Sequence, residues 1–517
     1  MSLAQRCGYA SAERATERAT EPATEPATER DAAVQALLQR LDDDGIEQLR
    51  IVWCDLHGAW RGKTLVCSPG QPAVQAALAD GVGLVSTVLL KDTSDHTAFK
   101  VFEPGALQGL PGFAAANNVL LLPDPASYQR LPWASGTAWL RAEPFWPDGQ
   151  AVAVDTRGVL QRALERLAEK GYGLRCGLEV EFHVYRISSP MPGPEAAPWP
   201  ADVPALQLVH PGFMLLGDSH ADLADEVFSV VRRTALGLGL PLRSLEIELG
   251  PSQVEAVFGA TDALTAADQM VLFRNAVRQA LRRAGYHASF ACRPPFDGAI
   301  ASGWHLHQSL VALNSSDGCN AMARLEAPVG DALDARQLLS DPGALWLAGL
   351  LAHAQGMAVL AAPTISAYSR FKGSLMAPQA AVWGRDNRGA MLRVVGELGQ
   401  TDTRVENRLG EPMANPYLYI ASQVLAGLDG LARGVQPPPA CEAPYGQPGA
   451  PTSTDLPALP ASLGEALDAL AADSVISQGL GPPLLQLLLA VKRQELARFA
   501  AASNATEWLR REYFARF

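Results

Sequence analysis

Two glutamates and a histidine alternate with apolar side chains in the stretch GLEVEFHVY, residues 177–185. Because successive side chains of a β-strand point to opposite faces, Glu179, Glu181 and His183 are predicted to share one face. The two glutamates would then lie roughly 6.6 Å apart and repel each other. Taken alone, the stretch favours a surface strand whose polar face lies in water. The rest of the chain must decide between such a surface and a site that binds cations.

Three further segments repeat this alternation of apolar and ionisable residues. They are SLEIELGPSQVEAVF (244–258) with Glu246, Glu248 and Glu255, ASGWHLHQSL (301–310) with His305, His307 and Ser309, and TRVENRL (403–409) with Arg404, Glu406 and Arg408. Any one of them would fit a solvated sheet surface. Together their residue types are complementary, which favours one shared site.

The pooled polar faces contain a set of candidate metal ligands, namely Glu179, Glu181, Glu248, Glu255, His305 and Glu406. Hard oxygen ligands with at most one imidazole suit Mg²⁺ or Mn²⁺, whereas zinc more often recruits thiolates or several histidines. So many carboxylates in one cavity also require cations to be tolerable. We therefore expect Mg²⁺ or Mn²⁺ at this site.

Arginines supply the second half of the expected chemistry. Arg370, Arg388, Arg393, Arg404 and Arg408 fall in or near the segments that lead into these strands. Guanidinium groups match the geometry of phosphate and carboxylate. Divalent ions with a set of arginines describe a site that transfers a phosphoryl group. A surface ion pair is the simpler explanation for Arg388 or Arg393 taken alone.

A second phosphate-binding signal proves to be a near miss. The stretch GAWRGKT, Gly58 to Thr64, resembles a Walker A loop but has three residues between its first glycine and the Gly-Lys pair, where the motif requires four. A β-ribbon with a basic turn is the better interpretation.

Composition narrows the class of partner and the compartment. The 517 residues carry a formal net charge of −12, which argues against a nucleic acid or an anionic membrane as partner and favours small molecules. The seven cysteines are scattered without metal-ligand spacing, as expected of reduced thiols in a cytosol. The N-terminal residues resemble neither a secretory signal nor a transit peptide, and we expect a cytoplasmic protein.

One charge-free stretch, Leu345 to Pro363, is long enough to suggest a membrane span. Its histidine, glutamine, glycines and many alanines favour a buried core helix instead, so we expect no membrane span.

Composition shifts divide the chain into three parts. Residues 12–30 form a short-period repeat of small, charged and proline residues, which predicts a disordered tail over 1–33. A small α+β unit is expected over 34–145, ending where prolines, glycines and aromatic residues crowd together. The remainder, 146–517, interleaves strand-like and helical patterns, is interrupted by a proline-rich loop after Arg433, and is helical in pattern from Ser462.

Seven ordered motifs give the chain a family resemblance from about residue 36 onward. They are LEVEF at Leu178, ELGPSQVE at Glu248, SGWHLHQSL at Ser302, AYSRF at Ala367, WGRDNRGAMLR at Trp383, RVENR at Arg404 and ANPYLYIASQVLAGLDG at Ala414. This order resembles the glutamine synthetase superfamily. The resemblance implies an α+β fold with an N-terminal β-grasp domain and a catalytic domain whose antiparallel strands shape a funnel-like site.

The resemblance also implies a role for individual residues. Glu181, Glu248 and Glu255 resemble the ligands of one metal ion, and Glu179, His305 and Glu406 those of a second. The ATP contacts would be His307, Ser309, Arg393 and Arg404, and the clamp on glutamate would be Arg370 and Arg408. Arg388 resembles the arginine that steadies the transferred phosphate, and Asp55 the aspartate that serves the ammonium site of a neighbouring subunit. His183 and Glu246 match no functional position.

The implied reaction joins glutamate to an amine in two steps. The γ-carboxylate of glutamate attacks the γ-phosphoryl group of ATP, and an amine then captures the resulting acyl phosphate. The family resemblance further implies a homo-oligomer, a dodecamer of stacked rings, with sites shared between subunits.

Two departures from the ammonia-using members concern the amine. Those members carry an acid in a flap of the type GYEAP, whereas GSLMAP places Met376 there, and a thioether can neither stabilise ammonium nor act as a base. Ile300 and Ala301 also replace the Asn-Gly pair that precedes Ser-Gly in those members. The chain therefore resembles members that γ-glutamylate polyamines or monoamines, which match it closely at APQAAVWGRDNR.

Asp55 keeps an ammonia-using glutamine synthetase open as an alternative, and a catalytically silent structural homologue is a second. Six occupied ligand positions argue against the silent homologue, because a silent protein has no physical need for these mutually repelling groups. Thr454 stands where adenylylated enzymes carry a tyrosine, so that form of regulation is expected to be absent.

Overall fold

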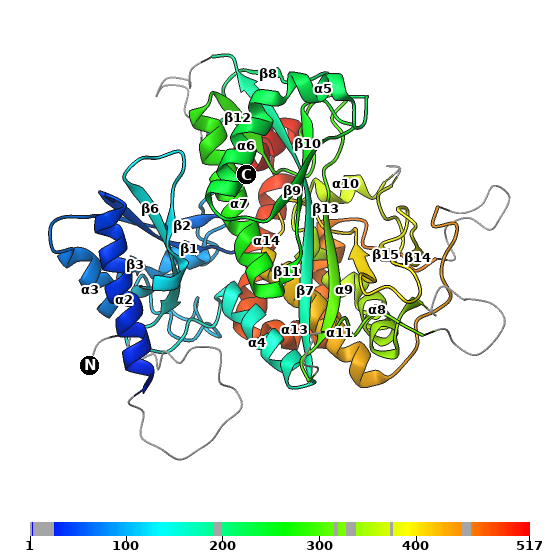
Figure 1. Ribbon diagram of the computed structural model, residues 1–517, viewed down its shortest axis with the longest axis horizontal. Helices are drawn as coiled ribbons and strands as arrows, with labels where there is room; N and C mark the ends of the chain where they lie inside the picture. Colours follow the sequence, from blue (N-terminus) through cyan, green and yellow to red (C-terminus); the bar gives the residue numbers. More distant parts are fainter. Residues whose placement is uncertain are drawn as a thin grey trace. The chain divides into compact units, whose positions relative to one another are not determined.

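The computed structural model of the 517-residue chain describes residues 3, 25–189, 199–314, 319–326, 338–372, 376–445 and 456–517. The chain divides into two compact units (Figure 1). Unit 1 comprises Met1–Lys91 and His96–Asp155, and unit 2 comprises Asp92–Asp95 and Thr156–Phe517. The fold class expected from the sequence, α+β, is confirmed.

Unit 1 is built on a sheet in the order β2-β1-β6-β4-β3, with β5 paired to β6. Its strands are β1 (Gln48–Cys54), β2 (Trp60–Val66), β3 (Val82–Val85), β4 (Asn118–Pro123), β5 (Gln129–Arg130) and β6 (Thr137–Phe145). β1 and β6 run parallel, and the other pairs are antiparallel. The unit also contains α2 (Glu25–Asp43), α3 (Pro72–Asp80) and the 3₁₀ turns η1 (Ser86–Leu90) and η2 (Pro125–Ser127). The near-Walker stretch lies on the β1–β2 hairpin, as a ribbon requires.

The first helix begins earlier than the composition suggested. α2 starts at Glu25, so residues 25–33 belong to a helix and not to the expected tail. Two hydrogen bonds explain this difference, because the guanidinium of Arg30 donates to the carbonyls of Leu78 and Pro123 at 3.1 Å each. Such contacts between segments far apart in sequence are not visible in local composition. Residues 1, 2 and 4–24 lie outside the described part of the chain.

Unit 2 is organised around one long strand, β7 (Tyr172–Ile187), in a sheet ordered β14-β15-β16-β13-β7-β10-β9. The other strands of this order are β9 (Leu242–Ile247), β10 (Gln253–Phe258), β13 (Trp304–Ala312), β14 (Trp383–Arg385), β15 (Leu392–Val395) and β16 (Arg404–Asn407). Three short strands, β8 (Leu206–Leu208), β11 (Thr261–Asp262) and β12 (Tyr286–Ser289), pair with other parts of β7. Except for the parallel pair β14–β15, the pairs are antiparallel.

The helices described in unit 2 are α4 (Thr156–Ala168), α5 (Asp218–Leu223), α6 (Asp225–Gly237), α7 (Ala263–Arg283), α8 (Asp341–Ala352), α9 (Ala354–Ala361), α10 (Ala367–Arg370), α11 (Pro416–Arg433), α12 (Leu463–Ala472), α13 (Ser474–Leu480), α14 (Pro482–Ala500), α15 (Ala505–Leu509) and the π-helical turn η6 (Arg510–Phe514). Of these, α4 and α7 pack against β7 (Figure 1). Phe182 of β7 packs against Phe273 of α7 and stacks on Phe290. Since Phe182 alternates with Glu181, this packing turns the glutamates to the opposite face.

The charge-free stretch forms two buried helices, α8 and α9, with a bend of 78° at His353. No single helix in the described ranges is long and apolar enough to cross a membrane. Taken together as bent pairs, α8 with α9 and α13 with α14 do reach the length and apolar composition of a span. The expected core helix is thus present in two pieces.

An ion-paired histidine holds the bend between α8 and α9. The ring of buried His353 lies 2.7 Å from Asp473 through Nδ1 and 2.9 Å from Asp429 through Nε2. Burial alone would lower the pKa of His353, but the hydrogen bonds to Asp473 and Asp429 outweigh it and raise the pKa. Both ring nitrogens therefore donate, and the imidazolium joins α11 and the α12–α13 junction to the bend.

We predict that His353→Gln lowers the free energy of unfolding by about 2 kcal/mol, because charge-assisted hydrogen bonds are lost. A raised folded-state pKa stabilises fully below the unfolded value of about 6.5, and the effect is lost as the pH rises through the folded value. The difference between wild type and variant in urea unfolding should therefore shrink as the pH rises above about 6.5. His220→Gln, at a half-buried histidine without an ion pair in the described residues, serves as the control. A loss that does not change with pH would contradict the imidazolium.

Candidate active site

Strand register brings the predicted polar faces together across the sheet. Glu179 of β7 lies opposite His305 of β13, and Glu181 lies opposite Glu255 of β10. Directly opposed residues have Cβ atoms roughly 5 Å apart, so the four side chains form one cluster.

The same rows continue outward on both sides of the cluster. On one side Glu255 faces Glu246 of β9. On the other side His307 and Arg393 both face Glu406 of β16. The sheet therefore carries carboxylates at one end of the polar face and a mixture of imidazole, carboxylate and guanidinium at the other.

A cavity of about 570 Å³ opens over this face. The predicted site residues that line it are Glu179, Glu181, Glu248, Glu255, His305, Arg370, Arg388, Arg393 and Arg408. Glu406 lies beneath it, fully buried and in contact with Arg393 and Arg408. A cavity of this size accommodates a small-molecule substrate.

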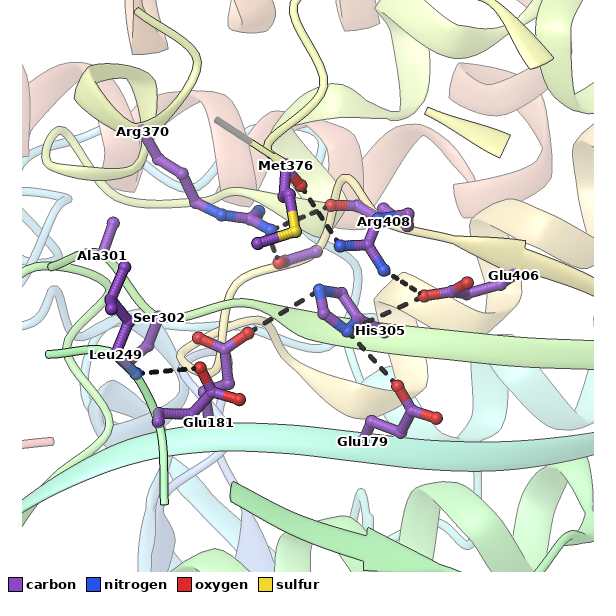
Figure 2. A network of polar contacts seen from close by, with 12 residues as sticks. Glu179, Glu181, Leu249, Ala301, Ser302, His305, Arg370, Met376, Glu406 and Arg408 are labelled. Carbon is purple, nitrogen blue, oxygen red and sulfur yellow. Dashed lines mark hydrogen bonds and ion pairs between the residues drawn. The ribbon is translucent and has the colours of Figure 1, made fainter. Parts of the chain in front are cut away.

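His305 is the centre of the polar network in Figure 2. Its Nδ1 lies 3.4 Å from Glu179 and 3.7 Å from Glu406, and its Nε2 lies 3.7 Å from Glu181. Glu179 also contacts His307 Nε2 at 2.8 Å. Burial would raise the pKa of Glu179, but the hydrogen bonds to His305 and His307 together hold it below its usual range. Glu179 is therefore a charged ligand candidate at neutral pH.

Two arginines neutralise Glu406. Arg393 donates to its Oε2 at 2.8 Å and Arg408 to its Oε1 at 2.5 Å. Although burial acts in the opposite direction, His305 and these arginines lower the pKa of Glu406 to about 2. A cation that uses Glu406 must share it with these guanidinium groups.

The opposite end of the polar face is electrostatically strained. Burial, and then the neighbouring charge of Glu181, raise the pKa of Glu248 to about 8 and that of Glu255 to about 10. Glu248 lies just beyond the end of β9 and accepts a hydrogen bond from its neighbour's amide, Leu249 N, at 3.2 Å. These carboxyls hold protons at neutral pH unless a cation replaces them.

Sequence reasoning missed Gln253, which holds Glu181 in place. Gln253 Nε2 donates to Glu181 at 2.9 Å and to the hydroxyl of Ser302 at 3.1 Å, while its Oε1 accepts from Gly250 N at 2.8 Å. Gln253 lies two residues before Glu255 on β10, so alternation had already placed it on the ligand face. The signal was present, but an uncharged amide was not considered.

His183 is not among the residues that line the cavity. It is fully buried, and its Nδ1 lies 3.3 Å from the hydroxyl of Ser302. Burial, with a smaller contribution from His210, lowers the pKa of His183 to about 3, so the ring is neutral. The surface-strand alternative is wrong for this histidine, because the strands and loops around β7 cover it.

Two groups of side chains have ligand atoms close enough to hold one ion each. Glu179, Glu255 and His305 form one group, and Glu179, His307 and Glu406 form the other, with ligand atoms within 4.8 Å of one another. This division differs from the expected one, since Glu179 belongs to both groups and His307 replaces His305 beside Glu406. Glu181 and Glu248 border the first group from β7 and the end of β9.

The arginines expected to clamp glutamate are partly engaged with the backbone. Arg370 donates to the carbonyls of Gly410 and Arg408 at 3.1 Å each, and Arg408 donates to the carbonyl of Met376 at 3.2 Å. Both arginines are buried and border the cavity. Arg388 is exposed at the cavity and makes no ion pair among the described residues.

The remaining predicted residues are not among those that line the cavity. Arg404 donates to His307 Nδ1 at 3.2 Å, and Ser309 lies further along β13, opposite Arg175. Asp55 belongs to unit 1, where it accepts from Arg61 at 2.7 Å and from the amides of His57 and Ala59 at 2.9 Å each. Despite its burial, Arg61 and His57 lower the pKa of Asp55. Thr454 lies outside the described residues.

Besides its carboxylates and arginines, the cavity has an apolar wall. Leu215, Leu216, Leu249, Ile300, Ala301 and Met376 line it. The loop that carries Leu215 and Leu216 is fixed by main-chain hydrogen bonds, from Phe213 N to Leu249 O at 2.7 Å and from Leu216 N to Ile247 O at 3.0 Å. Leu216 is nevertheless 64% exposed and Met376 48% exposed. Exposed apolar groups at a cavity mouth mark a place for an apolar ligand.

Known proteins resemble the chain over most of its length. It is 35% identical over 502 residues to a gamma-glutamylanilide synthase of an Acinetobacter species, covering 94% of this chain and 96% of the relative. It is 33% identical to a gamma-glutamylethanolamide synthetase of Streptomyces coelicolor, covering 76% of this chain and 78% of that relative. A glutamate–isopropylamine ligase of a Pseudomonas species is 29% identical, covering 77% of this chain and 80% of that relative.

Solved structures and a family model agree with these relatives. GmaS bound to ADP aligns with a TM-score of 0.71 and 26% identity, covering 92% of this chain and 98% of that one. A novel glutamine synthase homolog also gives 0.71 and 26%, covering 90% and 99%. The model of the glutamine synthetase catalytic domain matches residues 153–513. The chain therefore belongs to the glutamine synthetase family, whose ligases use ATP, divalent metal ions, glutamate and an amine.

Proposed function

We propose that this ligase joins the γ-carboxyl group of glutamate to an apolar primary monoamine. The observation that carries the proposal is the apolar wall of the cavity, where Met376 stands at the position of the flap acid and Leu215 and Leu216 extend the surface. The relatives named for anilide, ethanolamide and isopropylamine products support a monoamine as acceptor.

The chemistry needs two balanced steps. An oxygen of the glutamate γ-carboxylate attacks the γ-phosphorus of ATP, and the bond to the bridging oxygen breaks to release ADP. The amine nitrogen then attacks the acyl carbon. The bond between this carbon and the phosphate oxygen breaks, phosphate leaves with the bonding electrons, and the nitrogen loses a proton. Activation is required because a carboxylate oxygen is otherwise a poor leaving group.

Following the family resemblance, we assign one divalent ion to Glu181, Glu248 and Glu255 and a second to Glu179, His305 and Glu406. The observed groups, Glu179–Glu255–His305 and Glu179–His307–Glu406, overlap these two sets and add His307 to the second. The oxygen-rich ligand set favours Mg²⁺ or Mn²⁺. Such ions would neutralise the triphosphate and the charge that develops during transfer. The strained carboxyls support this assignment, because a cation relieves their mutual repulsion.

The arginines divide between the two anions. Arg393 and Arg404, with His307 and Ser309, are proposed to contact ATP, and Arg370 and Arg408 to bind glutamate. Arg388 is the candidate to steady the transferred phosphoryl group, because its exposed guanidinium has no competing acid among the described residues.

The apolar wall also decides which protonation state of the amine binds. An ammonium group that enters an apolar surface loses its hydration without gaining a counter-charge. An amine that is neutral at physiological pH avoids this cost and needs no base before it attacks. An aromatic amine, whose ring withdraws the nitrogen lone pair, meets both conditions. A polyamine, which carries several positive charges, fits less well.

Two broader assignments complete the proposal. A cytoplasmic location supplies ATP and glutamate, and the described cysteines are free thiols, as expected there. A homo-oligomer of the dodecameric family type would bring Asp55 of a neighbouring subunit to the site. In that case the ion pair of Asp55 with Arg61 must open or be shared.

An amine panel tests the proposed function. We expect ADP release with aniline, which is neutral at physiological pH, to exceed that with isopropylamine, ammonia and putrescine, which are protonated, as judged by kcat/KM at fixed glutamate and ATP. Burying an apolar group against Leu216 contributes about 1–2 kcal/mol, so Leu216→Ser should raise KM for aniline roughly tenfold and leave KM for ATP unchanged. Met214→Ser is the matched control, since Met214 lies in the same loop and is outside the cavity lining. A preference for ammonia or putrescine would refute the monoamine assignment.

A charge introduced at the flap should reverse the preference. Met376→Glu restores an acid to the apolar wall, so kcat/KM for ammonia should rise at least tenfold and that for aniline should fall. Met376→Gln, which matches the shape without the charge, should leave ammonia use low. Equal behaviour of both variants would show that the missing acid does not set amine choice.

The raised carboxyl pKa values predict that metal binding releases protons. At about pH 7, Glu248 and Glu255 carry protons in the metal-free protein, so a bound ion displaces up to about two of them. The apparent affinity for Mn²⁺ should therefore fall as the pH falls, roughly tenfold per pH unit for each proton released. Calorimetry in buffers of different ionisation enthalpy counts the protons. Glu255→Gln should release fewer protons, whereas Glu246→Gln, at the carboxyl outside the proposed ligand set, should not. Metal binding without proton release would contradict this assignment.

A further inference from the structure

A second cavity of unit 2, of about 510 Å³, is lined by arginines and shares no lining residue with the candidate active site. Arg278, Arg282 and Arg283 come from the C-terminal half of α7, and Arg516 comes from the end of the chain. Asn275 and Gln279 add side-chain amides at helical spacing from Arg278 and Arg282. The formal net charge of the chain is −12, so the positive charge of this cavity is opposite in sign to the net charge of the protein.

The arginines on α7 form a row of like charges. Arg274, Arg278 and Arg282 follow one another at a spacing of four residues, which places neighbouring guanidinium groups on one face and destabilises the helix. Arg274 is buried and donates to the carbonyls of Pro412 and Ala414 at 2.7 and 3.0 Å. Those bonds fix Arg274 beside Arg278.

Arg278 has no counter-ion in the part of the chain that the structure describes. Its Nε is buried without a hydrogen-bond partner, and it takes part in no ion pair among the described residues. Burial, and then the charges of Arg274 and Arg516, lower the pKa of Arg278 to about 10. The neighbouring His287 is also affected, since burial first and then Arg278 and Arg282 lower its pKa to about 4. Both groups report a positive potential inside the cavity.

The one acid among the described lining residues is already engaged. Asp202 accepts from Arg510 at 2.5 Å and lies 3.9 Å from Arg511. Favourable placement of cations at a helix C-terminus explains Arg282 and Arg283 in the last turn of α7. It does not explain Arg278, which lies more than one turn earlier. A bound anion would explain the buried Arg278.

We propose that this cavity binds a small polyanion that carries phosphate or several carboxylates. Guanidinium groups pair with both chemistries through two parallel hydrogen bonds, and the cavity is within the size range of small-molecule sites. The helix α7 that supplies Arg278 also covers the back of β7 through Phe273. The ligand would therefore sit behind the sheet and not on its carboxylate face.

The test is calorimetric titration of inorganic pyrophosphate into the full-length protein freed of divalent ions. Because arginines also line the first cavity, the variants of the second cavity decide which of the two binds the probe. We expect saturable binding to wild type and an affinity at least tenfold lower for Arg278→Gln. Arg162→Gln removes the same charge from an exposed position on α4 and should bind like wild type. Arg282→Gln changes an exposed residue at the rim of the cavity. It should also lower the affinity for pyrophosphate, which tests the proposal even if the Arg278 variant folds poorly.

Citrate in a parallel titration distinguishes the two ligand chemistries. Binding of pyrophosphate alone would identify a phosphate site, and binding of both would identify a general polyanion site; either result supports the proposal. No saturable binding of either probe would overturn it. Equal affinity of the Arg278, Arg282 and Arg162 variants would also overturn it, because the anion would then bind elsewhere. These outcomes do not depend on ligase activity or on the choice of amine.

Discussion

The mutual repulsion of buried carboxylates is the constraint on which the rest of unit 2 depends. Glu181, Glu248 and Glu255 are close enough, and dry enough, to raise the pKa values of two of them by several units. A fold can hold such groups together only if its other contacts are strong. The long strand β7 meets this need, because Phe182 between the glutamates packs on Phe273 and Phe290. The stability of the apolar face thus supports the strain on the polar face.

The polar face divides its tasks by charge balance. Glu406 is neutralised by Arg393 and Arg408 and remains ionised, whereas Glu255 lacks such a partner and takes up a proton. A site for phosphoryl transfer needs both conditions, since cations must be attracted at one end and a polyphosphate tolerated at the other. His305 and its neighbour Glu179 stand between these two regions. The pKa of His305 is lowered first by burial and then by Arg408, which keeps its ring neutral and available as a ligand.

Local patterns in the sequence predicted the parts of the site that depend on alternation. Glu179 and Glu181 of β7, His305 and His307 of β13 and Glu406 of β16 lie opposite one another on the face that alternation predicted, and the fold class is confirmed. The roles of the individual residues remain predictions. Alternation could not show that Glu248 lies beyond the end of β9, nor that His307 shares Glu179 with His305. Side-chain packing between strands decides such contacts, and no single strand contains that information.

Features that depend on distant segments were invisible for a related reason. The start of α2 is fixed by carbonyls of Leu78 and Pro123, and the bend at His353 by acids more than seventy residues away. Leu215 and Leu216 carry no local signal of a cavity wall, because main-chain hydrogen bonds to Ile247 and Leu249 place their loop beside the cavity. Local sequence patterns identify residues with unusual chemistry, whereas the tertiary structure determines which residues they contact.

The apolar wall and the carboxylate row together limit the amine more strongly than either would alone. In the proposed function Glu248 and Glu255 serve the metal ions, so a cationic amine would have to compete with these ions for a counter-charge. A neutral amine does not compete with the metal ions. In the proposed function it binds to Leu216, Met376 and their apolar neighbours. The absence of a flap acid and the presence of an apolar wall therefore favour the same substrate, a neutral amine. They keep the carboxylates for the metal ions and leave the amine to be selected by its apolar part.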